Sequence, residues 1–241
     1  MINTILFDLD GTLLKITQET FITNYFGKLK KVFERLEMNP DLSVKAVWAG
    51  TKAMVENDGT VLNHRRFWDT FTGFLNLDDE KRSVVERNCD AFYTNEFNTV
   101  KEVMEPTDIP SRLIPALAAK GYTVALATNP LFPACAVTTR LDWIGLTPHD
   151  FSYITHYANS KYCKPNLEYF REVLGKLNKQ PGECIMVGNN VDEDMCAGRL
   201  GMETFLITDC LENESGTKIE AYKHGTQAEL EAYLMSLPDL M

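Results

Sequence analysis

The chain has 241 residues, with 24 Lys and Arg against 34 Asp and Glu, so its formal net charge is −10 at pH 7. With 44% hydrophobic and 24% charged residues, its composition is typical of a soluble globular protein and excludes disordered, collagen-like and coiled-coil chains. At this length we expect one large α/β domain, or a core domain with a smaller second one. The negative charge disfavours binding to nucleic acid, so an anionic substrate would have to be captured locally.

The N-terminal residues show no basic stretch, apolar core or small-residue cleavage site of a secretion signal. Apolar runs elsewhere are well short of the roughly 20 residues that a membrane-spanning helix needs. We therefore expect a cytoplasmic protein with no membrane partner. The cysteines show no C-x-x-C pair or regular spacing, which predicts reduced thiols rather than a zinc site or a disulfide framework.

Five short apolar segments predict buried parallel strands. The first runs from Ile2 to Phe7 and stops at the polar, glycine-containing run Asp8-Leu9-Asp10-Gly11-Thr12. The other four are Tyr122 to Ala127, Phe151 to Thr155, Cys184 to Val187 and Thr204 to Ile207. They alternate with helical patterns at Ser111 to Lys120, Leu167 to Leu177 and Asp194 to Leu200. This alternation predicts the α/β class, with a doubly wound parallel sheet covered by helices on both faces.

Residues 15–107 carry helical periodicity and almost no strand signal. Apolar residues recur at three- and four-residue steps from Phe21 to Leu36, and further helices are expected around Leu42 to Val55, Arg65 to Leu75 and Asp79 to Phe97. Such a segment is too long for a loop and large enough to bury a small core. We predict that residues 15–107 form a smaller all-helical cap domain, and that residues 1–14 and 108–241 form the α/β core domain.

Polar groups follow four of the predicted strands. In an open parallel sheet, ligands bind outside the carboxyl ends of the strands, so these groups are expected to meet. The groups are Asp8 and Asp10 after the first strand, Thr128 and Asn129 after the second, Lys161 and Lys164 near the third, and Asn189, Asn190, Asp192 and Asp194 after the fourth.

These residues resemble the motifs of the haloacid dehalogenase (HAD) superfamily. The matching runs are Asp8-Leu9-Asp10-Gly11-Thr12, Thr128-Asn129, Lys164-Pro165 and Gly188-Asn189-Asn190-Val191-Asp192-Glu193-Asp194. The D-x-D-G-T run after a strand is fairly specific, whereas the two dipeptides gain weight only from their order. The helical insert lies where the helical cap of that superfamily belongs. The resemblance implies a Rossmann-like core and a phosphatase rather than a dehalogenase, because the dehalogenases of the family lack the second Asp.

The resemblance implies a role for each matched residue. Asp8 would be the nucleophile that forms an aspartyl-phosphate, and Asp10 would protonate the leaving alkoxide and then activate water. Thr128 would donate to a phosphoryl oxygen, and Lys164 would offset the negative charge. Gly11, Thr12 and Asn129 would also bind the substrate. Gly11 would permit a tight turn whose N–H groups face the phosphate.

A Mg²⁺ ion is the cofactor that the resemblance implies. Its ligands would be Asp8, the backbone carbonyl of Asp10 and a group after the fourth strand. Family members usually have Asp directly after the glycine of that strand, and here the position is Asn189, with Asp194 five residues later. We expect Asn189 to ligate with weakened Mg²⁺ affinity and Asp194 to hold a metal-bound water or Lys164. Asp192 remains an alternative ligand.

Other interpretations of these residues stay open at this stage. Thr128 and Asn129 could cap a helix beginning near Leu131, and Asp194 could be a first-turn acid. Lys161 competes with Lys164, which is favoured because Pro165 is typical of a first helical turn. Arg65 and Arg66 are expected on the solvated surface, with contact to a second anionic group of a substrate as the alternative. The insert aromatics Phe21, Phe26 and Trp68 are expected in the core rather than in contact with substrate.

The predicted function is Mg²⁺-dependent hydrolysis of a small-molecule phosphomonoester. One alternative is a phosphomutase with the same core, which would return the phosphoryl group to a substrate. Another is a non-catalytic phosphate-binding or regulatory protein, an alternative that rests on Asn189 in place of the usual Asp. No local motif assigns the substrate or the oligomeric state.

Overall fold

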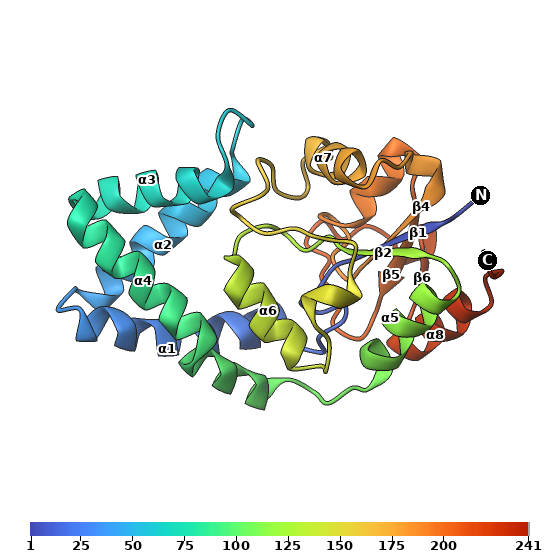
Figure 1. The fold of residues 1–241 in the computed structure, drawn as a ribbon, viewed down its shortest axis with the longest axis horizontal. Coiled ribbons are helices and arrows are strands. Elements are labelled where there is room, and N and C mark those ends of the chain that lie inside the picture. Colours follow the sequence, from blue (N-terminus) through green and yellow to red (C-terminus); the bar gives the residue numbers. More distant parts are fainter. Residues whose placement is uncertain (241) are drawn as a thin grey trace.

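The computed structural model describes residues 1–240, and its centre is a six-stranded parallel sheet (Figure 1). The strand order is β3-β2-β1-β4-β5-β6, so β1 lies between β2 and β4. All five predicted strands are present, and the sixth, which the sequence did not suggest, is an edge strand of three residues without an apolar run. The strands are β1 Thr4–Phe7, β2 Thr123–Leu126, β3 Tyr153–Ile154, β4 Cys184–Gly188, β5 Glu203–Ile207 and β6 Lys223–Gly225.

Helices cover both faces of the sheet, as the alternating pattern predicts. Alternate residues of a strand point to opposite faces. Ile5 and Phe7 of β1 pack in one apolar cluster with α5 (Ile109–Ala119) and α8 (Gln227–Met235). Leu6 packs in a second cluster with α7 (Leu167–Leu177). The doubly wound α/β fold is therefore confirmed.

The segment predicted as the last core helix, Asp194 to Leu200, is a 3-10 helix, η4 (Met195–Leu200). It contains Gly198 and ends at Gly201 in the left-handed conformation, so only a short stretch of it favours helix. Three shorter 3-10 helices lie in connections: η2 (Pro148–Asp150), η3 (Pro181–Glu183) and η5 (Ile219–Ala221).

The insert between β1 and α5 is helical throughout its regular structure. Its helices are α1 (Gln18–Arg35), α2 (Pro40–Val55), α3 (Asn63–Leu75), α4 (Asp79–Thr94) and the 3-10 helix η1 (Glu96–Val103). The last helix predicted there divides in two because the backbone at Asn95 is not helical. Figure 1 shows α1 to α4 grouped at the end of the molecule away from both termini. The division of the chain into two domains remains a prediction.

The two connections between insert and core lie side by side. The N–H of Glu105 donates to the carbonyl of Lys15 at 2.9 Å, and Lys15 Nζ lies 2.7 Å from Asp209 of the core. Gln227 at the start of α8 donates to the carbonyls of Thr12 and Leu13. The chain therefore leaves and re-enters the core at one place, next to the end of β1.

Helix α6 (Ala134–Asp142) follows β2 and packs against α4 and η1 of the insert. Its position matters for the site because it carries Arg140, a fully buried arginine. Among residues 1–240, no helix has the length and apolar character needed to cross a membrane.

Candidate active site

A buried chain of charges lies at the carboxyl end of β1. Lys164 Nζ is 2.9 Å from Oδ1 of Asp8 and 2.6 Å from Oδ1 of Asp194. Asp8 comes directly after β1, and Asp194 lies just after the β4 loop, so adjacent strands bring them together. The other oxygen of Asp194 accepts the N–H of Asn190 at 3.0 Å. Two predicted catalytic residues and one predicted metal ligand therefore meet around one ammonium group.

Burial and charge shift the protonation of this cluster. Burial is the largest influence on the pKa of Asp8 and raises it, and the negative charge of Asp194 raises it further. Together they outweigh the lowering effect of Lys164, so that the pKa of Asp8 is about 8. Burial lowers the pKa of Lys164, but the carboxylates of Asp194 and Asp8 outweigh it and raise that pKa well above its usual value. Lys164 is therefore a permanent cation, whereas the Asp8 carboxyl holds its proton more tightly than a free aspartate, and further positive charge beside it would favour its ionised form.

The residues after β2 form another side of the site. Thr128 is 3% exposed, and its carbonyl accepts hydrogen bonds from Thr155 (2.6 Å) and Tyr169 (2.9 Å). Asn129 donates to Glu193 at 2.9 Å, while its Oδ1 is buried without a hydrogen-bond partner among the described residues. The structure thus holds the backbone here firmly and leaves a polar atom of Asn129 without a partner beside the cleft.

Asn189 has both ends of its amide engaged. Its Nδ2 donates to the carbonyl of Cys210 at 2.7 Å, and its Oδ1 accepts from the Thr12 hydroxyl at 3.0 Å. Gly11 has a φ of +79° and lies against the same amide, where a Cβ would come within 2.2 Å of Nδ2. Thr12 and Gly11 thus support Asn189. Neither is among the residues that line the cleft, whereas Asn189 is.

Asp10 points to a partner that the sequence analysis did not name. Its Oδ2 forms an ion pair with Arg140 of α6, and its Oδ1 is buried without a partner among residues 1–240. Burial raises the pKa of Asp10, and the positive charge of Arg140 opposes that rise. The guanidinium also lies 4.5 Å from the ring centre of Phe132. No local motif marks Arg140; a lone arginine among apolar residues of a predicted helix was the only signal.

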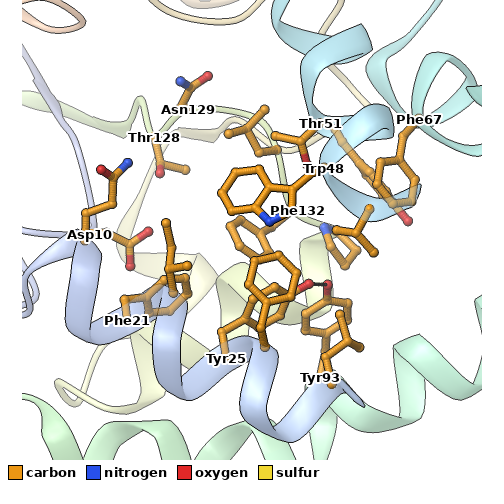
Figure 2. Close-up of a pocket in the computed structure, with 18 of the residues that line it drawn as sticks. Asp10, Phe21, Tyr25, Trp48, Thr51, Phe67, Tyr93, Thr128, Asn129 and Phe132 are labelled. Carbon is orange, nitrogen blue, oxygen red and sulfur yellow. Dashed lines mark hydrogen bonds between the residues drawn. The ribbon is translucent and has the colours of Figure 1, made fainter. Parts of the chain in front are cut away.

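One cleft joins this cluster to the insert (Figure 2). Figure 2 shows Asp10, Thr128 and Asn129 on one side and a group of aromatic rings from the insert and from Phe132 on the other. Phe21, Phe26 and Trp68 are among the lining residues. Phe21 and Trp68 are buried in the core and Phe26 packs against it, as expected. The helix faces that carry these rings also border the cleft.

The family model for haloacid dehalogenase-like hydrolases matches residues 2–200. The chain belongs to this family. The match includes the D-x-D-G-T run, the insert and the β4 loop, so the resemblance seen in the motifs is confirmed, and the chain is a hydrolase.

Curated relatives of this HAD-like hydrolase span nearly its whole length. The pyrophosphatase PpaX of Halalkalibacterium halodurans is 24% identical, covering 100% of this chain and 95% of the relative. The glyceraldehyde 3-phosphate phosphatase of Methanopyrus kandleri is 26% identical, covering 86% and 84%. Among solved structures, a HAD phosphatase from Thermococcus onnurineus matches with a TM-score of 0.61 at 19% identity, covering 99% of this chain and all of the other; it shows the same fold.

Two alternatives from the sequence are decided by position in this HAD-like hydrolase. Lys161 is exposed, so Lys164 is the lysine that reaches Asp8. Helix α6 begins at Ala134 after Pro133, so Thr128 and Asn129 do not cap it. Pro165 precedes Asn166, the N-cap of α7, so it is not in the first turn and the argument that favoured Lys164 was wrong in detail.

The paired arginines of the insert do not reach the cleft. Arg65 pairs with Asp69 at 3.3 Å, and Arg66 pairs with Asp58 at 2.7 Å. Neither is among the lining residues. The surface position expected for these arginines is confirmed, and acidic neighbours on the insert surface hold both side chains away from the cleft.

The carboxylate and amide oxygens at the floor of the cleft fit a hard cation such as Mg²⁺. Among residues 1–240, no three His, Cys, Asp or Glu side chains are arranged as a metal site. However, Lys164 contacts only Oδ1 of Asp8, and the Oδ1 of Asn189 retains a second lone pair beside its bond to Thr12. Carboxylate and amide oxygens are ligands that Mg²⁺ accepts. By contrast, both oxygens of Asp194 already accept hydrogen bonds, from Lys164 and from Asn190.

Proposed function

We propose that the protein is a Mg²⁺-dependent phosphatase that hydrolyses a small phosphomonoester through an aspartyl-phosphate on Asp8. The observation that carries the proposal is the buried Asp8–Lys164–Asp194 chain at the floor of the cleft. A nucleophilic carboxylate divides a difficult displacement at phosphorus into two easier ones. Membership of the hydrolase family and the two relatives with phosphate-containing substrates support the same proposal.

Asp8 and Asp10 would share the bond making and proton transfer. An oxygen of Asp8 forms a bond to phosphorus while the bond from phosphorus to the alcohol oxygen breaks, and protonated Asp10 gives its proton to that oxygen. A water then attacks the phosphorus, gives a proton to Asp10, and releases Asp8 and inorganic phosphate. The raised pKa of Asp10 suits a carboxyl that must be protonated at the first step.

Lys164 and the residues after β1 and β2 would stabilise the phosphoryl group. Lys164 favours the ionised form of Asp8 and orients it, and Asp194 holds Lys164 in place. Thr128 would donate its hydroxyl to a phosphoryl oxygen, and Asn129 would bind beside it. Gly11 and Thr12 lie behind Asn189, so we assign Thr12 a supporting role and leave Gly11 only its backbone N–H as a phosphate donor.

The proposed Mg²⁺ would be held by Asp8, the backbone carbonyl of Asp10 and Asn189. When bound, it supplies positive charge that lets the anionic phosphate approach the Asp8 carboxylate. We do not place Asp194 in direct contact with the ion; its proposed role is to hold Lys164, whose Nζ lies 2.6 Å from its Oδ1. The insert would act as a cap that limits water at the site, in a cytoplasmic enzyme.

The test is release of inorganic phosphate from a panel of small phosphomonoesters, with Mg²⁺ and with a chelator. Wild type is expected to turn over at least one ester only with Mg²⁺, and Asp8→Asn is expected to lose at least about 10³-fold in kcat. Asp192→Asn is the matched control, because Asp192, the alternative ligand suggested by the sequence, belongs to the same β4 loop but does not line the cleft, and its Oδ2 accepts the N–H of Ser215. Isomerised phosphate esters without free phosphate would identify a phosphomutase, and binding of phosphate without turnover would identify a non-catalytic protein.

A further inference from the structure

The side of the cleft opposite Asp8 is a wall of aromatic rings from four helices of the insert and the loop before α6. Tyr25 lies 5.5 Å from the ring centre of Phe132 at a steep angle, and Trp48 lies 5.3 Å from Phe26. We call the following residues the aromatic wall: Phe21, Tyr25, Trp48, Phe67, Tyr93 and Phe132 (Figure 2). These residues come from segments far apart in the chain and converge on the space next to Asp10.

The two tyrosine hydroxyls of the aromatic wall are turned to each other. The hydroxyls of Tyr25 and Tyr93 lie 2.7 Å apart in a mutual hydrogen bond. Burial raises the pKa of both phenols, so both stay neutral. Tyr25 and Tyr93 therefore offer ring faces and edges rather than free hydroxyl donors to a bound molecule. Trp48 is 47% exposed and lines the cleft.

Acidic side chains line the cleft without basic ones. Among residues 1–240, the residues that line it include no lysine, arginine or histidine. Its lining carboxylates are Asp8, Asp10, Asp90, Glu193, Asp194 and Glu212. The buried cations Lys164 and Arg140 lie behind Asp8 and Asp10 and are paired with them. A substrate with a second phosphate or a carboxylate would meet no countercharge outside the phosphoryl position, and would meet Asp90 at the insert end.

On the basis of the proposed function, we propose that the substrates are phosphomonoesters of uncharged aromatic or similarly apolar alcohols, whose ring is bound by the aromatic wall and which carry no second anionic group. The phosphoryl group lies at Asp8 and the ring extends toward Trp48. Burial of the ring provides the binding energy, and edge-to-face contacts with the wall orient it. This substrate class differs from pyrophosphate and from glyceraldehyde 3-phosphate, the compounds in the names of the two relatives.

The first test compares matched esters. We expect kcat/KM for benzyl phosphate to exceed that for ethyl phosphate by about tenfold or more, because burial of two or more extra ring carbons is enough for that factor. We expect 4-carboxybenzyl phosphate to lose that advantage and pyrophosphate to be poorer still. Equal values for benzyl and ethyl phosphate would overturn the inference while leaving the phosphatase function intact. A preference for pyrophosphate, 4-carboxybenzyl phosphate or the cationic phosphocholine would also overturn it.

Variants test the location of the ring. Trp48→Ala is expected to reduce the benzyl-to-ethyl ratio of kcat/KM about tenfold, mainly through KM. Phe74→Ala is the matched control, because Phe74 is 48% exposed on α3 and does not line the cleft; it should leave the ratio unchanged. An Asp90→Asn variant should improve 4-carboxybenzyl phosphate relative to benzyl phosphate. If Trp48→Ala and Phe74→Ala had the same ratio as wild type, the aromatic wall would not be the ring site.

Binding separates this inference from the proposed catalysis. Benzylphosphonate and ethylphosphonate cannot be hydrolysed at the carbon–phosphorus bond, and Trp48 and Trp68 of the cleft provide an intrinsic fluorescence signal. We expect benzylphosphonate to bind about tenfold more tightly, with Trp48→Ala removing the difference when calorimetry replaces fluorescence. If benzylphosphonate binds more tightly than ethylphosphonate but no ester is hydrolysed, only the phosphatase function is contradicted. Absence of the preference would overturn the inference whether or not phosphate is released.

Discussion

Arg140 on α6 forms an ion pair with Asp10, the second aspartate of the D-x-D-G-T run, and this pair joins the insert side of the core to the candidate catalytic loop. The side chain of Arg140 is 1% exposed, and its Nε donates to the carbonyl of Ala136 within α6. Its guanidinium lies next to Phe132 of the aromatic wall. Arg140 therefore fixes the direction of Asp10 relative to Asp8 and is a positioning residue.

Replacing Arg140 tests that role. Arg140→Met leaves Asp10 without its partner, so we expect the free energy of unfolding to fall by about 3 kcal/mol. We also expect kcat/KM for benzyl phosphate to fall at least about tenfold more than that for 4-nitrophenyl phosphate, whose good leaving group needs little protonation by Asp10. Arg140→Lys should recover part of both losses.

The control is Arg112→Met, which removes an exposed arginine paired with Glu231 and should change neither quantity appreciably. Equal losses for the two esters in Arg140→Met would show that Arg140 acts on stability alone, and the positioning role would be wrong.

Asn189 occupies the place where the family usually has Asp, and the structure suggests why an amide stands there. Its Nδ2 donates to the carbonyl of Cys210, and a carboxylate could not make that bond. We expect Asn189→Asp to lower the Mg²⁺ concentration for half-maximal activity several-fold, and also to lower the free energy of unfolding in chelator by about 1–3 kcal/mol. Mg²⁺ titration and urea denaturation in chelator measure these separately. An unchanged activation constant would remove Asn189 from the proposed ligand set.

Gly188 ends β4 where only hydrogen fits. A Cβ there would lie 2.1 Å from the carboxyl carbon of Asp194, which is held by Lys164. We expect Gly188→Ala to lower the free energy of unfolding by about 1–3 kcal/mol and to disturb phosphate release. Gly27→Ala is the matched control, because Gly27 lies within α1 with open space around it, and should stabilise by about 1 kcal/mol. Equal urea midpoints for the two variants would contradict the close packing at Gly188.

The raised pKa of Asp90 predicts that the stability of the protein depends on pH. Desolvation is the main cause that raises the pKa of Asp90 in the folded chain. The folded state therefore binds the proton more tightly than the unfolded state, so ionisation of Asp90 costs stability above the folded pKa and costs nothing below the unfolded value. Asp90→Asn should be more stable than wild type at pH 7 by less than about 1 kcal/mol, because solvent screens the group. The difference should shrink as the pH is lowered toward 4; urea denaturation across that range measures it, and a constant difference would contradict this account.

The sheet and the residues at its carboxyl edge could be predicted from the sequence because both depend on local signals. The run Ile5 to Phe7 is a buried strand, and Asp8 follows it at the edge where parallel strands end. Strand order then brings Asp8 and Asp194 to the same lysine. The edge strand β6 was not predicted, because its three residues form no apolar run and are too few to show a periodic pattern.

The aromatic wall and Arg140 could not be predicted because they depend on tertiary packing. The spacing of Phe21 and Tyr25 shows that one face of α1 is buried, but does not show whether that face meets other side chains or a cavity. Arg140 is buried only because Asp10, 130 positions earlier in the chain, provides its countercharge. The hydrogen bond from Asn189 to Cys210 likewise joins loops that no sequence spacing connects.

The central claim is that Asp8 carries the phosphoryl group, and trapping that adduct tests it most directly. With ³²P-labelled 4-nitrophenyl phosphate and Mg²⁺, Asp10→Asn should form the adduct, because the leaving nitrophenolate needs little protonation by a general acid. The variant should then accumulate the adduct, because it lacks the general base that activates water for hydrolysis. We predict hydroxylamine-sensitive label on the peptide containing Asp8 in Asp10→Asn and none in the Asp8→Asn, Asp10→Asn double variant. Equal labelling of the two variants, or no label while wild type releases phosphate, would contradict the account.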